Sequence, residues 1–539
     1  MRKIIILLSI ALTFLISFST IFDKKLDLNG DNANYLTYAH NIAAGHGYSA
    51  LSYDASYQPV NHFPPAYSFV LSLFMRMGID SIVFFKVLNG ILMLLVIFII
   101  SHITARLSGN DWLGLSVGVF LALSAPMLHF ATMVMSEMNY AFFSALCFLS
   151  LWMYADNQDS GTTSQGQGNS GQALTPWYRC PWFYCAILSA VAAYYFRTMA
   201  MACIFALLVF YLVRKEWKQA LTSLAIAVVA YLPWVLRNKA AGLESRYFGT
   251  IMTVNPWRPE QGTISTPAEF VEKVLKNMDE TVVKAFTESL FPFVNVNYNE
   301  TSSWLLISGA LLIIAVMIYG CFVNRKFTWL LFAYFVGNIG LFGLWHGGNG
   351  IRYVVPLIPW IVMTFYLGVA GVVRLIKVKV AKPDKSNGKN AKQLDSKGGA
   401  LQLLALSLIV LALLEIPSVK LLAQQNRQAY PPAYKEYFDI AKQMKRHFKG
   451  KHVVVACRKP ELFMMYAPDI CARRYAFSDK PEEVIRDLEE HNTDYVILDA
   501  LGYSSTGLYL YPAIMQNQSR FKPVMQYDNP PTYLLHFER

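Results

Sequence analysis

Long apolar runs separated by short polar connections fill the first three quarters of the chain. A membrane-spanning helix needs about 20 mostly apolar residues, and on that criterion the sequence predicts about eleven spans. They lie near residues 4–18, 81–105, 113–131, 138–155, 182–196, 199–213, 220–236, 303–323, 327–345, 353–373 and 400–417. Because many further spans follow the first one and no clean A-x-A cleavage site is present, we expect residues 4–18 to be a retained anchor rather than a signal peptide.

Composition supports the same class of protein. Hydrophobic residues make up 55% of the 539 residues and charged residues only 15%, where soluble domains carry roughly a quarter charged residues. The mean hydropathy of +0.33 agrees. We therefore expect a polytopic α-helical protein of the lipid bilayer. The net charge of +12 does not indicate nucleic-acid binding, because membrane proteins gather Lys and Arg on their cytoplasmic loops.

The basic residues predict an orientation. They cluster on alternate connections, at Arg2, Arg106, Arg214, Arg325 and the linker 374–397. Placing all of these connections in the cytoplasm is consistent with an odd number of spans. The protein is then expected to cross the inner or plasma membrane many times, with a cytoplasmic N-terminus and an extracytoplasmic, periplasmic C-terminal segment.

Three longer segments fall on the outer side under this topology. Two belong to the expected membrane domain, residues 1–423: the first outer loop, 22–65, and a second outer loop, 237–301. In the second loop, Thr266 followed by Pro267 predicts the start of a helix. The third segment, residues 424–539, is polar enough to form a small soluble domain.

The pattern of that third segment alternates between helix and strand. Helices are predicted near 433–448, 460–467 and 480–491, and buried strands near 452–457, 470–477 and 494–500. This alternation is typical of a small α/β domain with a mainly parallel sheet. Cys457 and Cys471 fall on neighbouring strands, where they could form either a disulfide or two buried free thiols.

The first outer loop has a helical pattern of its own. Asp31, Tyr35 and Tyr38 recur at three- and four-residue spacing, so a helix with one polar and aromatic face begins at Asp31. Gly45 ends it. Pro64 and Pro65 then open a second, apolar helix.

A few charged residues lie where the apolar spans meet the outer side. They are Asp31, Glu137, Arg197, Arg237 and Arg352. Each arginine alone is typical of an interfacial side chain or a topology marker, and Glu137 alone is typical of a helix N-terminus. Two carboxylates and three arginines at one interfacial layer together favour a functional site.

The chemistry of such a site is that of group transfer from a lipid phosphate. Arginine keeps its charge and offers a planar donor fork that matches phosphate oxygens. A nearby carboxylate repels phosphate but can take a proton from an incoming hydroxyl or amine. A divalent cation held by Asp31 and Glu137 is an open alternative, although no ligand cluster requires one.

Several short runs resemble a known family. The runs are GDNANYLTYAHNIAAGHGY at 30–48, HFPPAY at 62–67, SE at 136–137, PW..RN at 233–238 and RY..PLIP at 352–359. They are similar to the GT-C glycosyltransferases, in particular the branch of protein-mannosyltransferases and aminoarabinose transferases. The resemblance covers about residues 1–370. It implies the GT-C fold, a polyprenyl-phosphate sugar as donor, and inversion at the anomeric centre.

The resemblance also assigns roles to single residues. It makes Asp31 the catalytic aspartate and Glu137 the second acidic residue. It places Arg352 and Tyr353 near the lipid phosphate, where Arg197 or Arg237 would join them. His62 takes the place of the His or Lys that precedes a Pro-Pro pair in the family.

Candidate substrate contacts are Tyr35, His62 and His346, the last with the alternative of a loop histidine without a catalytic role. Two departures leave the sugar and the acceptor open: Asn32 follows Asp31 in place of Glu, and NHFPP replaces FEKPP.

The sequence thus predicts an integral membrane glycosyltransferase that uses a polyprenyl-monophosphate sugar and acts on a glycan, lipid or protein acceptor outside the cytoplasm. Asp31 would be its general base. Two alternatives remain: a flippase or transporter of lipid-linked sugars, and a non-catalytic membrane scaffold. A transporter would place polar or broken helices near the bilayer midplane.

Overall fold

The computed structural model describes residues 2–165, 176–244, 247–322, 327–345, 348, 350–380 and 395–539. The chain forms two compact units. The first contains residues 1–23, 85–237 and 271–426, and the second contains residues 24–84, 238–270 and 427–539. The second unit thus combines most of the first outer loop, part of the second and the tail. The expected division into 1–423 and 424–539 stays a prediction.

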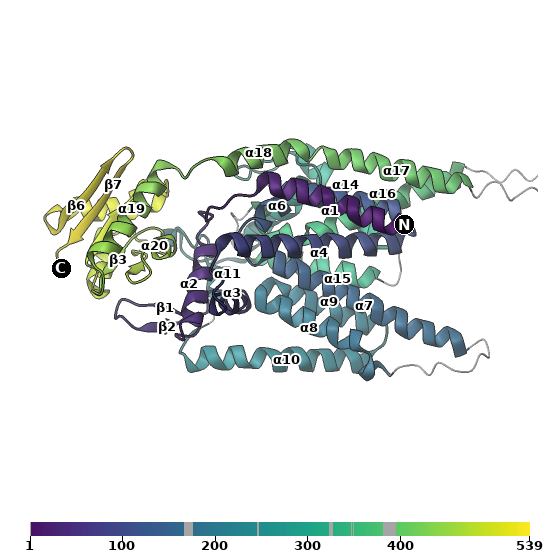
Figure 1. Ribbon diagram of the computed structural model, residues 1–539, viewed down its shortest axis with the longest axis horizontal. Coiled ribbons are helices and arrows are strands. Elements are labelled where there is room, and N and C mark those ends of the chain that lie inside the picture. Colours follow the sequence, from purple (N-terminus) through teal and green to yellow (C-terminus); the bar gives the residue numbers. More distant parts are fainter. Residues whose placement is uncertain are drawn as a thin grey trace, which may run out of the picture. The chain divides into compact units, whose positions relative to one another are not determined.

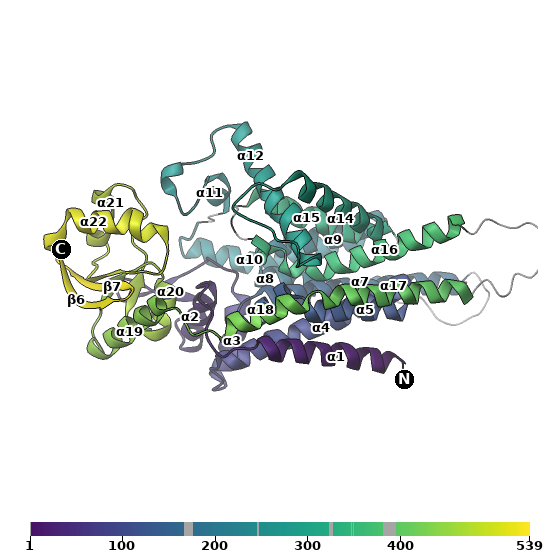
Figure 2. The same ribbon diagram turned by 90° about the horizontal axis from the view of Figure 1, so that it is seen from above.

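The first unit is helical, and its long helices run in roughly one direction (Figures 1 and 2). The helices of this unit include α1 (Arg2–Ile21), α4 (Ile82–Ser108), α5 (Asp111–Leu123), the short α6 (Ala125–Ala131), α7 (Glu137–Gln165), α8 (Pro181–Phe196), α9 (Met201–Val213), α10 (Trp217–Ala240), α14 (Trp304–Phe322), α15 (Thr328–Leu344), α16 (Ile358–Val380), α17 (Asp395–Leu413) and α18 (Ile416–Arg427). A further run joins α12 (Pro267–Met278), the π-helix η4 (Asp279–Ala285) and α13 (Phe286–Leu290). The predicted cap is present, because the backbone N–H of Glu269 donates to Oγ1 of Thr266 at 3.2 Å.

Among the described residues, seven helices are long and apolar enough to cross a membrane, or eight if the bent pair α5–α6 counts as one span. Three of the other predicted spans correspond to α8, α9 and α15, which are apolar but have only 16, 13 and 17 residues. The predicted count of about eleven is therefore not confirmed by helix length.

The predicted span 113–131 is broken in the middle. Helices α5 and α6 meet at Ser124 with a bend of 58°. Pro126 explains the break, because it has no backbone N–H to continue the ladder of α5 and fits the first turn of a new helix. Glu415, which lies between α17 and α18 and is fully buried, accepts a hydrogen bond from the backbone N–H of Ala125 at 3.3 Å.

Helices α14 and α16 cross at small residues. A Cβ built on Gly320 would lie 1.8 Å from the carbonyl oxygen of Thr364, and one on Gly368 would lie 2.1 Å from that of Val316. The two backbones therefore touch, as is usual where glycine lets membrane helices approach closely.

The second unit begins with the helical pair that the first loop predicts. Helix α2 (Asp31–Ala43) and helix α3 (Ala66–Arg76) confirm the starts at Asp31 and after Pro65. A short hairpin of β1 (Ser49–Leu51) and β2 (Tyr57–Pro59) lies between them. The remaining helices of this unit are α11 (Tyr247–Met252), α19 (Pro432–His447), α20 (Pro460–Tyr466), α21 (Pro481–Glu490) and α22 (Tyr511–Gln516).

A five-stranded sheet forms the centre of the tail. Its strands are β3 (Val454–Ala456), β4 (Cys471–Arg473), β5 (Tyr495–Leu498), β6 (Phe521–Asp528) and β7 (Pro531–Phe537), in the order β4-β3-β5-β7-β6. The first three strands are parallel, as predicted, whereas β7 pairs antiparallel with β5 and β6. The sheet is therefore mixed, because a hairpin that the sequence pattern did not predict completes it. Cys457 and Cys471 are buried free thiols.

Candidate active site

The first unit holds a buried carboxylate between two arginines. Glu137 opens α7 and is fully buried. Its Oε1 lies 2.7 Å from Nη1 of Arg197 and accepts a hydrogen bond from Nε of Arg352 at 3.1 Å. The two arginine side chains are only 11% and 17% exposed. Three of the five charged residues that the sequence singled out therefore form one cluster, which we call the Glu137 triad.

Local backbone geometry aims both arginines at Glu137. Arg197 ends α8 in an extended conformation (φ −150°, ψ 129°), and the short 3₁₀ turn Thr198–Ala200 then leads into α9. Arg352 lies on a second 3₁₀ turn, Gly350–Tyr353. Both arginines thus sit at helix interruptions, where the backbone can present a side chain across a bundle instead of along it.

An aromatic side chain lies beside the triad. The guanidinium carbon of Arg197 lies 6.0 Å from the ring centre of Tyr353, and the indole N–H of Trp345 donates to the Tyr353 hydroxyl at 2.9 Å. Tyr353 therefore lies next to this cluster, and its expected contact with a lipid phosphate stays a prediction. His346 lies outside the described residues.

Two residues that sequence reasoning missed hold the segment before Arg352. The carboxylate of Glu280 accepts a hydrogen bond from the backbone N–H of Gly348 at 2.7 Å. Asn277 donates to the carbonyl oxygen of Gly343 at 2.9 Å and also to that of Trp345. Both side chains are buried. Their three-residue spacing on the predicted helix 266–286 is the signal that could have identified them.

The triad carries a net charge of +1, from two guanidinium groups and one carboxylate. Oε2 of Glu137 is buried and has no hydrogen-bond partner among the residues that the structure describes. A divalent cation at Glu137 would face two guanidinium groups at ion-pair distance, so the triad does not fit a metal. Nor do the described residues contain a group of three His, Cys, Asp or Glu that could hold one. The charge instead suits an anion such as a phosphate.

Asp31 lies in the second unit, at the start of α2. The preceding Gly30 has φ +102°, which a residue with a side chain rarely adopts. The amide of Asn32 fixes the turn, because its Oδ1 accepts from the backbone N–H of Gly30 at 3.0 Å and its Nδ2 donates to the carbonyl oxygen of Asp27 at 2.7 Å. Asp31 itself is partly exposed.

The other predicted residues have different surroundings. Tyr35 is only 2% exposed and packs between Phe63 and Tyr67, at ring-centre distances of 4.5 and 5.0 Å. His62 is exposed, beside the same Phe63 ring. In the first unit, Arg237 lies near the end of α10 with its guanidinium 5.2 Å from the ring centre of Trp234. The roles of these residues stay predictions.

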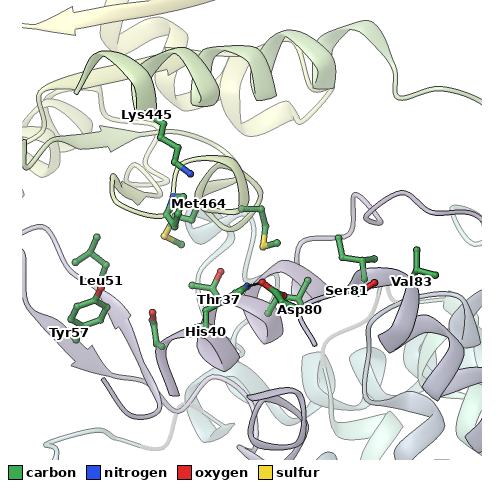
Figure 3. A pocket seen from close by; sticks show the side chains of 14 residues that line it. Thr37, His40, Leu51, Tyr57, Asp80, Ser81, Val83, Lys445 and Met464 are labelled. Atoms are coloured by element: carbon green, nitrogen blue, oxygen red, sulfur yellow. Dashed lines mark ion pairs between the residues drawn. The ribbon is translucent and has the colours of Figure 1, made fainter. Parts of the chain in front are cut away.

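A cavity of about 620 Å³ also lies in the second unit (Figure 3). Its walls include Leu36 and His40 of α2, Lys445 of α19 and Asp80, whose carboxylate lies 3.6 Å from Nε2 of His40. Leu36 and His40 follow Asp31 by about one and a half and two and a half helical turns. They therefore lie on the opposite side of α2 from Asp31, and the cavity does not contain the candidate base.

Comparison with solved structures identifies the fold. The archaeal oligosaccharyltransferase AglB from Archaeoglobus fulgidus, solved with an inhibitory peptide and a dolichol-phosphate, is similar over 100% of this chain and 75% of its own, with a TM-score of 0.58 and 12% identity. ArnT from Cupriavidus metallidurans, solved in the apo state and with undecaprenyl phosphate, is similar over 99% of this chain and 98% of its own, with TM-scores of 0.55 and 0.54 and 13% identity. Both proteins are members of the GT-C superfamily. The chain therefore has the GT-C fold.

No family model and no curated protein matches the sequence. The GT-C fold agrees with the resemblance seen in the short motifs, and the predicted fold class is confirmed. Together with the seven or eight apolar helices of spanning length, it makes the chain an integral, multi-pass membrane protein.

Proposed function

We propose that this protein is a glycosyltransferase that moves a sugar from a polyprenyl monophosphate to an acceptor on the extracytoplasmic face of the membrane. The observation that carries the proposal is the Glu137 triad. In it two largely buried arginines share one carboxylate, so that the three side chains have a net charge of +1, in a chain with the GT-C fold. The solved neighbours include AglB in complex with a dolichol-phosphate and ArnT bound to undecaprenyl phosphate. Their ligands share the phosphate monoester that a pair of arginines fits.

The arginines act on the leaving group. When the bond between the anomeric carbon and the phosphate oxygen breaks, negative charge grows on the polyprenyl phosphate. Arg197 and Arg352 are positioned in advance by Glu137, so they can stabilise this charge without reorganising. Removing one such preorganised contact typically costs about 3 kcal/mol of transition-state stabilisation.

Asp31 is the proposed general base. The acceptor hydroxyl or amine attacks the anomeric carbon from the face opposite the phosphate, which inverts that centre, and its proton passes to the Asp31 carboxylate. The products are the glycosylated acceptor and free polyprenyl phosphate. Partial exposure of Asp31 and the turn fixed by Asn32 support this role. Glu137 holds the arginines, and no step requires a metal.

The topology completes the proposal. Basic residues such as Arg2 and Arg106 mark cytoplasmic connections, which puts the N-terminus in the cytoplasm of an inner or plasma membrane. Asp31 and the tail 427–539 then lie outside. The acceptor is a glycan, a lipid or a protein of the cell envelope.

One observation favours a second candidate, transport of a lipid-linked sugar. The break between α5 and α6 at Ser124 and the buried Glu415 beside it place irregular backbone and a carboxyl inside the helical bundle. Transporters place such features near the bilayer midplane. A transporter would move the loaded carrier intact, without releasing polyprenyl phosphate.

The deciding experiment measures free undecaprenyl phosphate released by purified protein in nanodiscs that contain sugar-loaded carrier and an envelope extract as acceptor. Wild type should release it, and Asp31→Asn should not. Asp54→Asn is the matched control, because Asp54 lies in the exposed β1–β2 turn, where its side chain accepts hydrogen bonds from Ser56. Near-normal release by Asp31→Asn would overturn the base assignment. Transbilayer movement of the loaded carrier without release would favour the transporter.

A further inference from the structure

Charged residues gather at one edge of the sheet in the second unit. Arg458 directly follows Cys457 at the end of β3, Arg474 follows β4, and Asp499 follows β5. Strands β4, β3 and β5 are parallel, so their carboxyl ends meet at the same edge. In the order β4-β3-β5, the strand that follows β3 in sequence, β4, lies on one side of it, and the next strand, β5, lies on the other side. Open α/β sheets bind ligands outside the carboxyl ends of their strands at such a switch point.

Arg458 is a buried cation that makes no direct ion pair in the described part of the chain; the nearby carboxylate of Glu461 is already paired with Lys459 and Arg474, at 3.7 and 3.6 Å. Arg458 is 7% exposed, and among the described residues no carboxylate lies within ion-pair distance of it. Its Nε donates to Oγ of Ser505 at 2.6 Å, while Nη1 and Nη2 make no hydrogen bond in the described part of the chain. Burial, and then the neighbouring Arg474, lower its pKa. A guanidinium that is buried without a carboxylate in direct contact is costly, which favours an anionic ligand as its partner.

Asp499 offers an unmatched acceptor at the same edge. It is also 7% exposed. Oδ1 accepts from the backbone N–H of Leu501 and the hydroxyl of Thr506, at 3.2 and 3.3 Å. Oδ2 is buried and has no hydrogen-bond partner among the described residues. A buried oxygen of this kind calls for a donor, and a ligand hydroxyl would supply one.

Aromatic rings complete the cluster. The guanidinium of Arg458 lies 4.3 Å from the ring centre of Tyr503 and 5.6 Å from that of Trp257, and Arg474 lies 5.5 Å from the same indole. Trp257 comes from the second outer loop and is 48% exposed. A half-exposed indole beside two guanidinium groups, with the Asp499 carboxylate at the same edge, suits a sugar. The C–H face of a sugar ring packs on aromatic surfaces, and its hydroxyl groups form hydrogen bonds.

The edge lies against the loop of the candidate base. Nζ of Lys459 donates to the carbonyl oxygen of Asn29 at 2.8 Å. A Cβ built on Gly30 would lie 2.6 Å from Oε1 of Glu461, so the backbone directly before Asp31 packs on this carboxylate. A ligand at the sheet edge would therefore be held by the same unit that carries Asp31.

We propose that Arg458, Arg474, Asp499 and Trp257 form a binding site for an acidic glycan, whose phosphate or carboxylate contacts the two arginines. A hydroxyl of the adjoining sugar donates to Asp499, and the ring packs on Trp257. The proposal rests on the proposed function in one respect: it identifies this glycan as the acceptor. We call the four residues the acidic-glycan site.

The test measures binding to the full chain in nanodiscs of neutral lipid, without any donor, by isothermal titration calorimetry. The probes are glucose 6-phosphate and glucuronate, with glucose and inorganic phosphate as comparisons. Wild type should bind an acidic sugar at least about tenfold more tightly than glucose and more tightly than phosphate alone. Arg458→Gln should lose this preference, and Trp257→Ala should reduce affinity for the acidic sugar but not for phosphate.

Two further variants keep the test interpretable. Arg474→Gln alters a side chain that is 38% exposed, so it should fold even if Arg458→Gln does not, and it should weaken binding of the acidic sugar. Arg520→Gln is the matched control, because Arg520 is paired with Glu489 on another part of the tail, and its binding should equal wild type.

Equal affinity for glucose and both acidic sugars would overturn the site. So would phosphate binding as tightly as the acidic sugars, which would indicate a simple phosphate site. Because no donor is present, these results do not depend on transfer. A protein that binds the acidic sugar but never releases undecaprenyl phosphate would overturn the proposed function and leave the site standing.

Discussion

Replacing Glu137 with Gln should have opposite effects on stability and on donor binding. The carboxylate pairs with Arg197 at 2.7 Å and with Arg352 at 3.1 Å, and all three side chains are largely buried. Glu137→Gln keeps the shape but removes the carboxylate charge that the two largely buried guanidinium groups share. Breaking a buried pair in this way typically costs about 3–5 kcal/mol. The melting temperature of the ligand-free protein in detergent should therefore fall clearly.

The same change should strengthen binding of a phosphate. Removal of the carboxylate raises the charge of the triad from +1 to +2. For a phosphate about 5 Å from Glu137 and an effective dielectric constant of about 20, the lost repulsion amounts to roughly 3 kcal/mol per unit charge. The rise in melting temperature on adding undecaprenyl phosphate reports this affinity, and it should be larger for the variant than for wild type.

Glu216→Gln provides the matched control for this experiment. Glu216 also pairs with an arginine, Arg214, at 2.8 Å, but it belongs to a different cluster. Its loss should lower stability without changing the shift produced by undecaprenyl phosphate. A Glu137→Gln variant that is as stable as wild type, or whose melting temperature rises less with undecaprenyl phosphate, would contradict both expectations.

Three further changes test other parts of the structure. Gly30→Ala places a methyl group against Glu461 at a residue with φ +102°, so both the melting temperature and the transfer rate should fall. Burial raises the pKa of Asp499 to about 6 from 3.8. The contribution of Asp499 to the free energy of unfolding should therefore fall by up to about 3 kcal/mol as pH rises from about 4 to above 6. Asp499→Asn should abolish this fall in melting curves recorded across that range. Gly320→Ala should lower the melting temperature by forcing α14 and α16 apart. Gly309→Ala should not, because a Cβ built on Gly309 meets no atom within 4 Å. Equal melting temperatures of the two variants would contradict the close crossing.

The sequence predicted well whatever depends on neighbouring residues. Helix α2 begins at Asp31 and α3 follows Pro65, because glycine and proline act within one turn of the backbone. The alternation of helices and buried strands from 433 to 500 was correct for the same reason. The break at Ser124 was missed because the apolar run continues through it, and length and hydropathy do not register a bend.

Contacts between distant residues were beyond the sequence. Glu137 and Arg352 are 215 residues apart along the chain, and the pattern indicated a common membrane face but no pairing. Nor did it show that Arg237 lies over Trp234 or that Glu280 holds Gly348. The final hairpin escaped prediction because β6 contains Pro523 and β7 has little alternation. Such features depend on the tertiary structure.

The make-up of the second unit has a consequence for biosynthesis. It is assembled from three separate stretches, 24–84, 238–270 and 427–539, and β7 at Pro531–Phe537 pairs with two other strands of its sheet. The loop that carries Asp31 leaves the ribosome early, yet the residues that support it, Lys459 and Glu461, follow more than 400 residues later. A nascent or truncated chain can therefore insert its spans while the loop of Asp31, the proposed base, remains unsupported. If the proposed function holds, competence for transfer should arise only when synthesis is nearly finished.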